Sequence, residues 1–183
     1  MIIYVTRHGE TDWNAQSKVM GKVDIELNEK GIQQAQATRD ALAGTKIDLI
    51  ISSPLDRSLK TAEIINEGLN AELVTDARIS ERDFGEFEGL SRKDFDFNGF
   101  WSYQKNYKYQ EAENIEYFFN RVYDFLDSLS LLDSELNILI VAHGGTAVPI
   151  NCYFNGLPDD DNLLSFVLGN CEVTSYYFKT KKL

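Results

Sequence analysis

The chain contains only two histidines, His8 and His143, and each stands shortly after an apolar run and directly before a glycine. The two runs, 2–5 and 136–142, are short and rich in branched apolar residues, which is typical of buried strands. Glycine lets the backbone turn sharply and approach a ligand closely, because it has no Cβ atom. Arg7 adds a cation beside the first imidazole. We therefore expect a nucleophile-capable ring at the C-terminal end of each strand, where ligands of open α/β sheets bind.

This repeated setting has two interpretations. A single histidine at a strand end more often belongs to the folded framework than to a binding site. The same context twice, with no histidine elsewhere in the chain, favours a shared site. We therefore expect the two imidazoles to lie within about 10 Å of each other, in reach of one small ligand group.

Predicted strands and amphipathic helices alternate along the chain, which favours a three-layer α/β/α sandwich with a mostly parallel central sheet. Further strands are expected at 47–51, at 72–75 and, as an edge strand, at 172–178. Helices are expected at 29–43, between the N-cap Asn28 and Gly44, and at 55–69, 113–129 and 146–155. A short helix can begin after Thr11, and a basic tail follows at 179–182.

The segment Arg7-His8-Gly9-Glu10-Thr11, followed by Trp13 and Asn14, resembles the signature of the histidine phosphatase superfamily, the phosphoglycerate mutase-like proteins. The resemblance extends from Ile2 to about Phe178 and implies one phosphoglycerate mutase-like domain over residues 1–183. It implies that His8 is the nucleophile and that Asn14 contacts the phosphoryl group. From the pattern alone, a local turn bond explains Asn14 equally well.

Further blocks recur in the family's order. The family's phosphate-binding arginine matches Arg57, which by pattern alone would also fit a surface ion pair. The block 79–89 resembles the family segment whose first glutamate is the general acid, here Glu81, although an acid in such a loop is usually a solvated charge. The last block begins with His143 and Gly144, and the resemblance implies that both contact the substrate.

The resemblance implies phosphoryl transfer through a phosphohistidine. His8 would attack phosphorus and form a covalent intermediate, which divides one difficult step into two. Arg7 and Arg57 would bind the phosphoryl oxygens, because guanidinium groups suit bidentate phosphate contacts. His143 is expected to be cationic and to add a third positive donor. Glu81 would protonate the leaving oxygen and then activate water, for which burial must raise its pKa. No metal or other cofactor is expected.

Several positions depart from the family pattern or have no implied role. Met20 stands where the family often has glutamine, and methionine cannot donate a hydrogen bond to a substrate there. Glu88 is expected to be a structural hydrogen-bond acceptor, and Arg82 has no implied role. Residues 90–111 mix aromatic side chains, concentrated at 95–109, with three lysines and one arginine. This segment is predicted either to be lid-like over an anionic substrate or to pack on the edge of the sheet.

Composition restricts the partners. The chain has 183 residues, 43% hydrophobic content and a formal net charge of −11. A diffuse negative field opposes binding to nucleic acid or to anionic lipid, so neither is expected as a partner. Without an export signal or a membrane-spanning run, Cys152 and Cys171 are expected to be reduced thiols in a cytoplasmic protein. Nothing in the pattern assigns an oligomeric state.

The leading functional hypothesis is a metal-independent phosphatase that hydrolyses a small phosphorylated metabolite. A bisphosphoglycerate-dependent phosphoglycerate mutase is the alternative, but residues 90–111 are short beside the mutase insertion and contain no Arg-Arg pair. A third alternative is a catalytically silent binding protein on the same fold. Turnover of a phosphoester would exclude it.

Overall fold

A computed structural model describes residues 1–133 and 135–178, so the basic tail 179–182 lies outside the described residues. Five strands form one sheet in the order β3-β2-β4-β1-β5. The strands are β1 (Ile2–Arg7), β2 (Leu49–Ser52), β3 (Glu72–Thr75), β4 (Asn137–Ala142) and β5 (Val173–Tyr177). β5 pairs antiparallel with β1, and the other pairs are parallel. The predicted mostly parallel sheet with β5 as an edge strand is confirmed.

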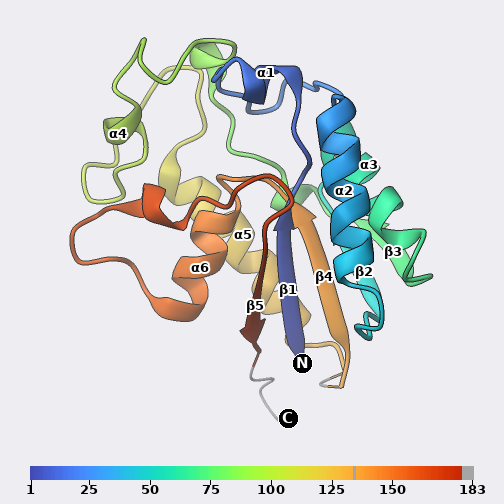
Figure 1. Ribbon diagram of the computed structural model, residues 1–183. Helices are drawn as coiled ribbons and strands as arrows, with labels where there is room; N and C mark the ends of the chain where they lie inside the picture. Colours follow the sequence, from blue (N-terminus) through green and yellow to red (C-terminus); the bar gives the residue numbers. More distant parts are fainter. Residues whose placement is uncertain (134, 179–183) are drawn as a thin grey trace.

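Helices cover both faces of the sheet, which gives the predicted three layers (Figure 1). α2 and α3 lie on one face, and α5 and α6 lie on the other. The helices are α1 (Asp12–Ala15), α2 (Glu29–Ala41), α3 (Asp56–Asn66), α4 (Phe97–Phe100), α5 (Ile115–Leu129) and α6 (Ala147–Asn155). Short 3₁₀ turns are η1 (Ala77–Ile79), η2 (Gly85–Phe87) and η3 (Leu163–Phe166).

The central strands are apolar on both sides, because each side packs against helices. Along β4, Leu139 and Val141 point into a small core beneath α2 and α3. The alternate residues Ile138 and Ile140 point into the larger core beneath α5 and α6. This alternation follows from the two-residue repeat of a strand. Because both faces of the strand are buried, its register is fixed, and in this register β1 and β4 end side by side.

Two helices end earlier than predicted. α2 ends at Ala41, and Gly44 follows with a φ of +85° in a turn. α3 ends at Asn66, whose side-chain amide bonds both the N–H and the carbonyl of Ala71. Asn70 between them takes a φ of +53°. Such side-chain bonds to the backbone compete with helix continuation, and the helical repeat of apolar residues does not show them.

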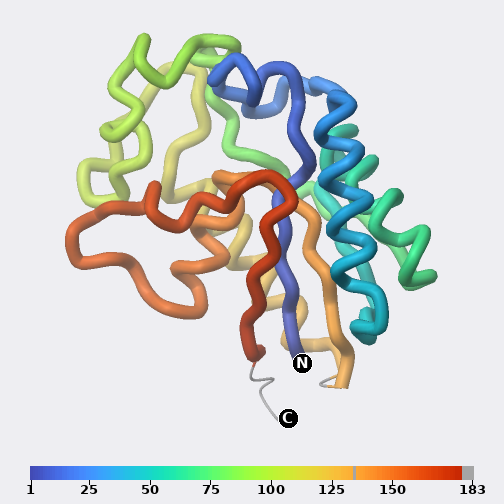
Figure 2. Tube along the Cα trace, viewed as in Figure 1, coloured from blue at the N-terminus to red at the C-terminus, as the bar shows by residue number. Residues whose placement is uncertain are grey.

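Residues 90–111, called here the aromatic segment, are mostly irregular and contain α4. Phe100 and Trp101 of this segment are buried in the larger core. The Phe100 ring stacks on Phe84 with 4.7 Å between centroids. Asp161 accepts a hydrogen bond from the Tyr103 backbone at 3.0 Å, so the segment runs beside the loop that precedes η3 (Figure 2). The aromatic segment thus packs against the larger core.

No helix within residues 1–133 and 135–178 combines the length and the apolarity needed to cross a membrane.

Candidate active site

The two histidines meet at the C-terminal edge of the sheet. β1 and β4 pair in parallel with Arg7 opposite Ala142, so the residues that follow them are neighbours. The His8 N–H donates to the carbonyl of Ala142 at 2.9 Å. The centroids of the His8 and His143 rings are 5.2 Å apart. The expectation that the imidazoles share one location is confirmed.

His8 is held in one tautomer. Its Nδ1 lies 2.7 Å from the carbonyl oxygen of Gly9, which requires a proton on Nδ1 and leaves the lone pair on Nε2. Gly9 permits this turn, because a Cβ there would lie 2.4 Å from the carbonyl oxygen of Gly31. Burial lowers the pKa of His8 well below its usual value, and the charges of Arg7 and Arg57 add to the effect. The ring is therefore neutral at pH 7, as a nucleophile must be.

The surroundings of His143 act against the positive charge that was expected for it. Its Nε2 contacts the hydroxyl groups of Ser53 at 2.8 Å and Ser58 at 3.3 Å. Burial lowers its pKa well below the usual value, and the positive charge of Arg57 lowers it further. Burial and the neighbouring guanidinium groups therefore favour a neutral His143 ring at pH 7 unless a bound anion offsets them. Its Nδ1 is buried and has no hydrogen-bond partner among the described residues.

Both predicted arginines are held at the same edge with donors to spare. Arg57 donates to the carbonyls of Gly21 at 2.7 Å and Val23 at 2.9 Å, and Arg7 donates to that of Leu168 at 3.0 Å. The Nε atoms of Arg7 and Arg57 are buried without a hydrogen-bond partner among the described residues. Buried donors are nearly always paired, so these orphans indicate a site for an anion.

Burial also lowers the pKa values of these two arginines. It lowers the pKa of Arg7 to about 10 and that of Arg57 below its usual value. Both remain cationic at pH 7.

Neither Arg57 nor His143 is among the side chains that border the main cavity. Arg57 is fully buried, and its charge nevertheless reaches both imidazoles.

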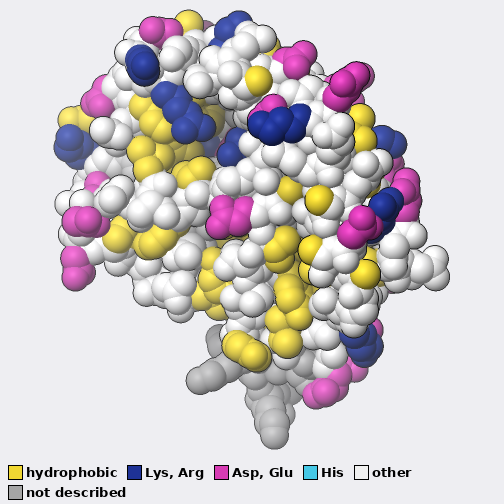
Figure 3. Space-filling view, viewed as in Figure 1, with side chains coloured by type: hydrophobic (Ala, Val, Ile, Leu, Met, Phe, Trp, Pro, Cys, Tyr) yellow, Lys and Arg dark blue, Asp and Glu magenta, His cyan; other side chains and the backbone are white. Residues whose placement is uncertain are grey.

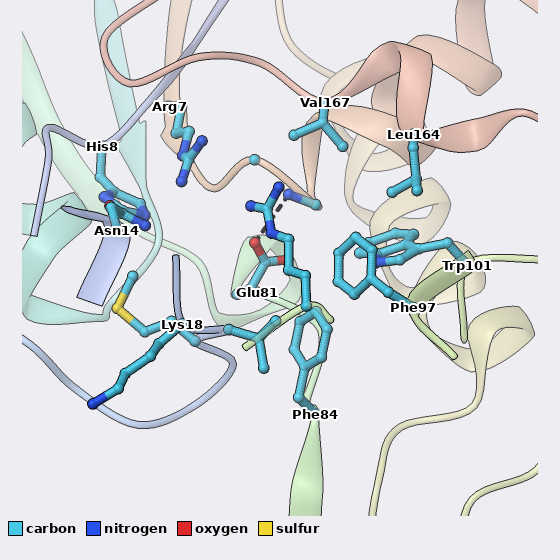
Figure 4. A pocket seen from close by; sticks show the side chains of 15 residues that line it. Arg7, His8, Asn14, Lys18, Glu81, Phe84, Phe97, Trp101, Leu164 and Val167 are labelled. Carbon is cyan, nitrogen blue, oxygen red and sulfur yellow. Dashed lines mark hydrogen bonds between the residues drawn. The ribbon is translucent and has the colours of Figure 1, made fainter. Parts of the chain in front are cut away.

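Glu81 lies across the cavity from Arg7 and His8, where Figure 4 shows its carboxyl group pointing into the space between them. Its Oε2 accepts from the Gly145 N–H and its Oε1 from the Arg82 N–H, both at 2.9 Å. The residue is only 7% exposed. Burial raises its pKa, against the two backbone bonds and the arginine charges that lower it. This is the direction that a general acid requires.

Asn14 is oriented by a residue that the sequence analysis missed. The Asn14 Oδ1 accepts from the Thr11 N–H and from Asn170 Nδ2, both at 3.2 Å. Asn170 also donates to the carbonyl of His8 at 2.9 Å. The Asn14 amide nitrogen is therefore the group left to serve a ligand in the cavity that Asn14 lines. Asn170 precedes β5, and only its pairing with Arg7 across the sheet reveals it.

The cavity of about 120 Å³ has a polar end and an apolar wall. Gly144 belongs to the polar end, where a Cβ would lie 3.3 Å from the Arg7 guanidinium. Apolar lining side chains come from four separate parts of the chain: Val19, Met20, Phe84, Phe97, Trp101, Leu164 and Val167. Lys18 and Arg92 also line the cavity, and Figure 3 shows basic side chains beside a hydrophobic patch on this face.

The structure also shows what Met20, Glu88 and Arg82 contact. The Met20 sulfur accepts a hydrogen bond from the Thr11 hydroxyl at 3.4 Å, so this side chain offers the cavity no donor. Glu88 accepts from the backbone of Lys22 and Val23 at 2.8 Å, which is the predicted structural role. Arg82 is fully buried, with its guanidinium 3.7 Å from the Phe100 ring centroid, where it anchors the aromatic segment.

No cluster of three or more His, Cys, Asp or Glu side chains in the described part of the chain is arranged as a metal site.

Comparison with known proteins shows which family and which structures this chain resembles. The sequence model of the histidine phosphatase superfamily (branch 1) matches residues 3–183. The uncharacterized phosphatase PhoE of Bacillus subtilis is 34% identical over 98% of this chain and 90% of its own. The putative phosphoserine phosphatase 2 of Hydrogenobacter thermophilus is 32% identical over 98% and 91%. The structure of a mycobacterial glucosyl-3-phosphoglycerate phosphatase in complex with VO3 has a TM-score of 0.84 at 26% identity, over 95% of this chain and 90% of that one.

Proposed function

The chain belongs to the histidine phosphatase superfamily, and we propose that it uses His8 as a covalent nucleophile in hydrolysis. It is a phosphatase of small phosphorylated metabolites, a phosphoric monoester hydrolase. The phosphohistidine and the residue roles are the proposal. The observation that carries it is a neutral, Nδ1-anchored His8 beside two buried arginines whose Nε donors have no partner among the described residues.

In the first step, the Nε2 lone pair of His8 attacks phosphorus in line with the ester oxygen. The N–P bond forms, the P–O ester bond breaks, and Glu81 gives its proton to the departing oxygen. Arg7 and Arg57 stabilise the charge that develops on the phosphoryl oxygens. Asn14 adds an amide donor. A phosphate dianion beside His143 would raise the pKa of that imidazole and favour its binding as a third positive donor.

In the second step, water attacks the phosphohistidine from the side that the alcohol has left. The Glu81 carboxylate accepts the proton of this water, the N–P bond breaks, and His8 and inorganic phosphate are regenerated. Glu81 thus returns to its acid form with no net change in proton count. The raised pKa of Glu81 suits both roles. The carboxyl group must hold a proton before the first step and release it during that step, and the carboxylate must accept a proton from water in the second step.

Trapping of the intermediate tests this proposal. Wild-type protein mixed with a labelled phosphoester and quenched within one turnover should retain an acid-labile phosphoryl group. His8→Ala should retain none, because no other residue carries the covalent step. His143→Asn, which removes a neighbour and keeps the nucleophile, should still be labelled. Label retained by His8→Ala would overturn the assignment of the nucleophile.

Glu81→Gln tests the acid. An alkyl phosphate needs protonation of its leaving oxygen, whereas a nitrophenyl phosphate does not. The variant should therefore lose about 10²- to 10⁴-fold in the phosphorylation rate on the alkyl ester and much less on the nitrophenyl ester. Equal losses on the two esters would remove Glu81 from this role.

A panel of phosphorylated metabolites with phosphate-release detection would identify the substrate. Phosphoserine belongs in it because of the relative's name. A mutase arm, with 3-phosphoglycerate and a bisphosphoglycerate primer, should show hydrolysis rather than isomerisation. We place the reaction in the cytoplasm, a compartment compatible with the free thiols of Cys152 and Cys171. The net charge of −11 supports the absence of nucleic acid and anionic membrane as partners.

A further inference from the structure

The loop that carries Glu81 lies between η1 and η2 and is irregular, yet its backbone is closely held by one side chain. Arg121, on α5, donates from Nη1 to the carbonyls of Arg78 at 2.6 Å and Ser80 at 2.8 Å. Its Nη2 donates to the carbonyl of Glu81 itself at 3.0 Å. One guanidinium therefore fixes three carbonyls within four residues of the loop.

Glu113 fixes this guanidinium in turn. Its Oε1 accepts from Arg121 Nε at 2.7 Å and its Oε2 from Nη2 at 2.9 Å, a bidentate pair that favours one orientation. A guanidinium has five N–H donors, and these five acceptors match that number. The pair is mostly buried, with side-chain exposures of 22% for Arg121 and 18% for Glu113.

Glu113 also holds the other side of Glu81. Its backbone N–H donates to the carbonyl of Asp83 at 2.9 Å, and its Oε2 accepts from the Asp83 N–H at 3.3 Å. Its carbonyl accepts from Arg82 Nε at 2.9 Å. Arg121 on α5 thus holds the chain up to Glu81, and Glu113, just before α5, holds the chain after it. An ion pair that served stability alone would not require bonds to the carbonyls of this one loop.

We propose that Glu113 and Arg121 are a positioning pair that sets the place of the Glu81 carboxyl group, and thereby the rate of proton transfer, without touching the substrate. This inference rests on the proposed function, in which Glu81 is the acid. Proton transfer depends on hydrogen-bond reach, and a misplacement of about 1 Å can cost about 10²-fold in rate. The anion site should not respond, because Arg7 and Arg57 are held by carbonyls elsewhere in the chain.

Arg121→Lys is the main variant. Lysine keeps the positive charge but has three donors on one nitrogen and cannot form the fork. We expect the phosphorylation rate on an alkyl phosphate to fall about 10- to 100-fold and that on a nitrophenyl phosphate to fall by less than about threefold. Vanadate affinity should stay within about twofold. Arg78→Lys is the matched control, because Arg78 lies in the same loop but donates to Asp76, Asp124 and Ser128.

Glu81→Gln serves as the reference background. If Arg121 acts through Glu81, Arg121→Lys should cause little further loss on the alkyl ester when glutamine already stands at 81. Losses that multiply in the double variant, or equal losses on both esters, would overturn the positioning role. Glu113→Gln, which keeps the shape of the acceptor, should show the same ester selectivity and replaces Arg121→Lys if that protein does not fold.

The acid role of Glu81 and the positioning role of Arg121 can fail separately. Ester selectivity in Glu81→Gln without ester selectivity in Arg121→Lys would overturn this inference and leave the proposed function standing. Absence of ester selectivity in Glu81→Gln would overturn the assignment of the acid, and the positioning role with it.

Discussion

The polar end of the cavity and its apolar wall are stabilised in opposite ways. The polar end is called here the phosphate end and includes the buried residues His143 and Arg57 behind it. At the phosphate end, His8, His143 and Arg57 are almost fully buried, and each carries a pKa lowered by that burial. At the wall, Trp101 is buried among other aromatic rings, and Phe100 lies buried behind the wall. Buried polar groups without partners oppose folding, whereas buried aromatic rings favour it. The wall and the cores therefore support a phosphate end that is unfavourable by itself.

This contrast predicts how variants separate. Changes at the phosphate end should remove activity and cost little stability. Changes in the aromatic segment should remove stability and leave anion binding intact in the molecules that remain folded. The predictions that follow test this separation, from the largest expected effect to the smallest.

His8→Ala should lower turnover by at least about 10⁴-fold, because removal of a covalent nucleophile removes the whole pathway. Its free energy of unfolding should change by less than about 1.5 kcal/mol, because the lost ring is replaced by a small apolar group in a site of buried cations. Phosphate release and urea unfolding measure the two quantities. A large loss of stability would contradict the division between the two ends.

Phe100→Ala should lower the free energy of unfolding by about 3–5 kcal/mol, the usual cost of truncating a buried phenylalanine. Phe100 is 1% exposed and lies against the Arg82 guanidinium. Vanadate affinity, measured well below the midpoint of thermal unfolding, should stay within about threefold of wild type. Weak vanadate binding by a stable variant would show that the aromatic segment shapes the anion site directly.

The phosphate end was largely predictable from the sequence because it depends on local pattern. His8 and His143 follow apolar runs, and runs of that kind form adjacent strands. Arg57 and Glu81 could be predicted only through the family resemblance, since a cation near a helix start and an acid in a loop have many uses. The lowered pKa of His143 could not be predicted from the sequence, because burial beside Arg57 is a property of the assembled fold.

The supporting residues were not predictable, because each acts across a long sequence separation. Asn170 reaches Asn14 over 156 positions, and Arg121 reaches Glu81 over 40. No periodicity or local motif reports such pairings. For the same reason, the sequence left two alternatives open for the aromatic segment. Its rings contact Phe84 and Phe87, which lie in a different block of the sequence.

Arg57→Ala should weaken vanadate binding by about 10- to 100-fold, in line with the loss of one or more charge-assisted hydrogen bonds at about 1.5–3 kcal/mol each. Arg57→Lys should recover only part of this loss, because a single ammonium cannot bond Gly21, Val23 and the anion as the fork can. Isothermal titration with vanadate measures both. Unchanged affinity in Arg57→Ala would remove this residue from the site.

Stability should depend on pH through the two imidazoles. In the unfolded chain a histidine binds a proton below about pH 6.5, whereas the lowered pKa values of His8 and His143 keep both rings neutral in the fold. The unfolded state then holds more protons, so stability present above pH 6.5 is lost as the pH falls, by up to about 1.4 kcal/mol per pH unit for each ring. The raised pKa of Glu81 acts with the opposite sign, since it removes stability as the pH rises.

A difference measurement isolates the histidine contribution. Urea unfolding of wild type and His143→Asn at pH 7.5 and 5.5 should show a smaller loss of stability in the variant, because one of the two rings no longer titrates. Glu81 contributes equally to both proteins and cancels. Identical pH slopes would mean that His143 is protonated in the fold.

The smallest effect is expected at Asn170, which supports the phosphate end without belonging to it. Asn170→Ala removes the donor that holds Asn14 Oδ1 and the carbonyl of His8. The Thr11 N–H still holds Asn14 Oδ1, so the amide keeps one of its two restraints. Vanadate affinity should fall by about 3- to 10-fold, the value of a typical hydrogen bond of about 0.5–1.5 kcal/mol.

Asn14→Ala supplies the test of how Asn170 acts. If Asn170 works by aiming the Asn14 amide at the anion, Asn170→Ala should cost little once Asn14 is already alanine. If it works instead by fixing the His8 backbone, the two losses in vanadate affinity should multiply. Asn155→Ala is the control, because the Asn155 side chain donates to that of Asn151 on α6. This variant should leave vanadate affinity unchanged. The double variant therefore decides which of the two bonds of Asn170 matters for the phosphate end.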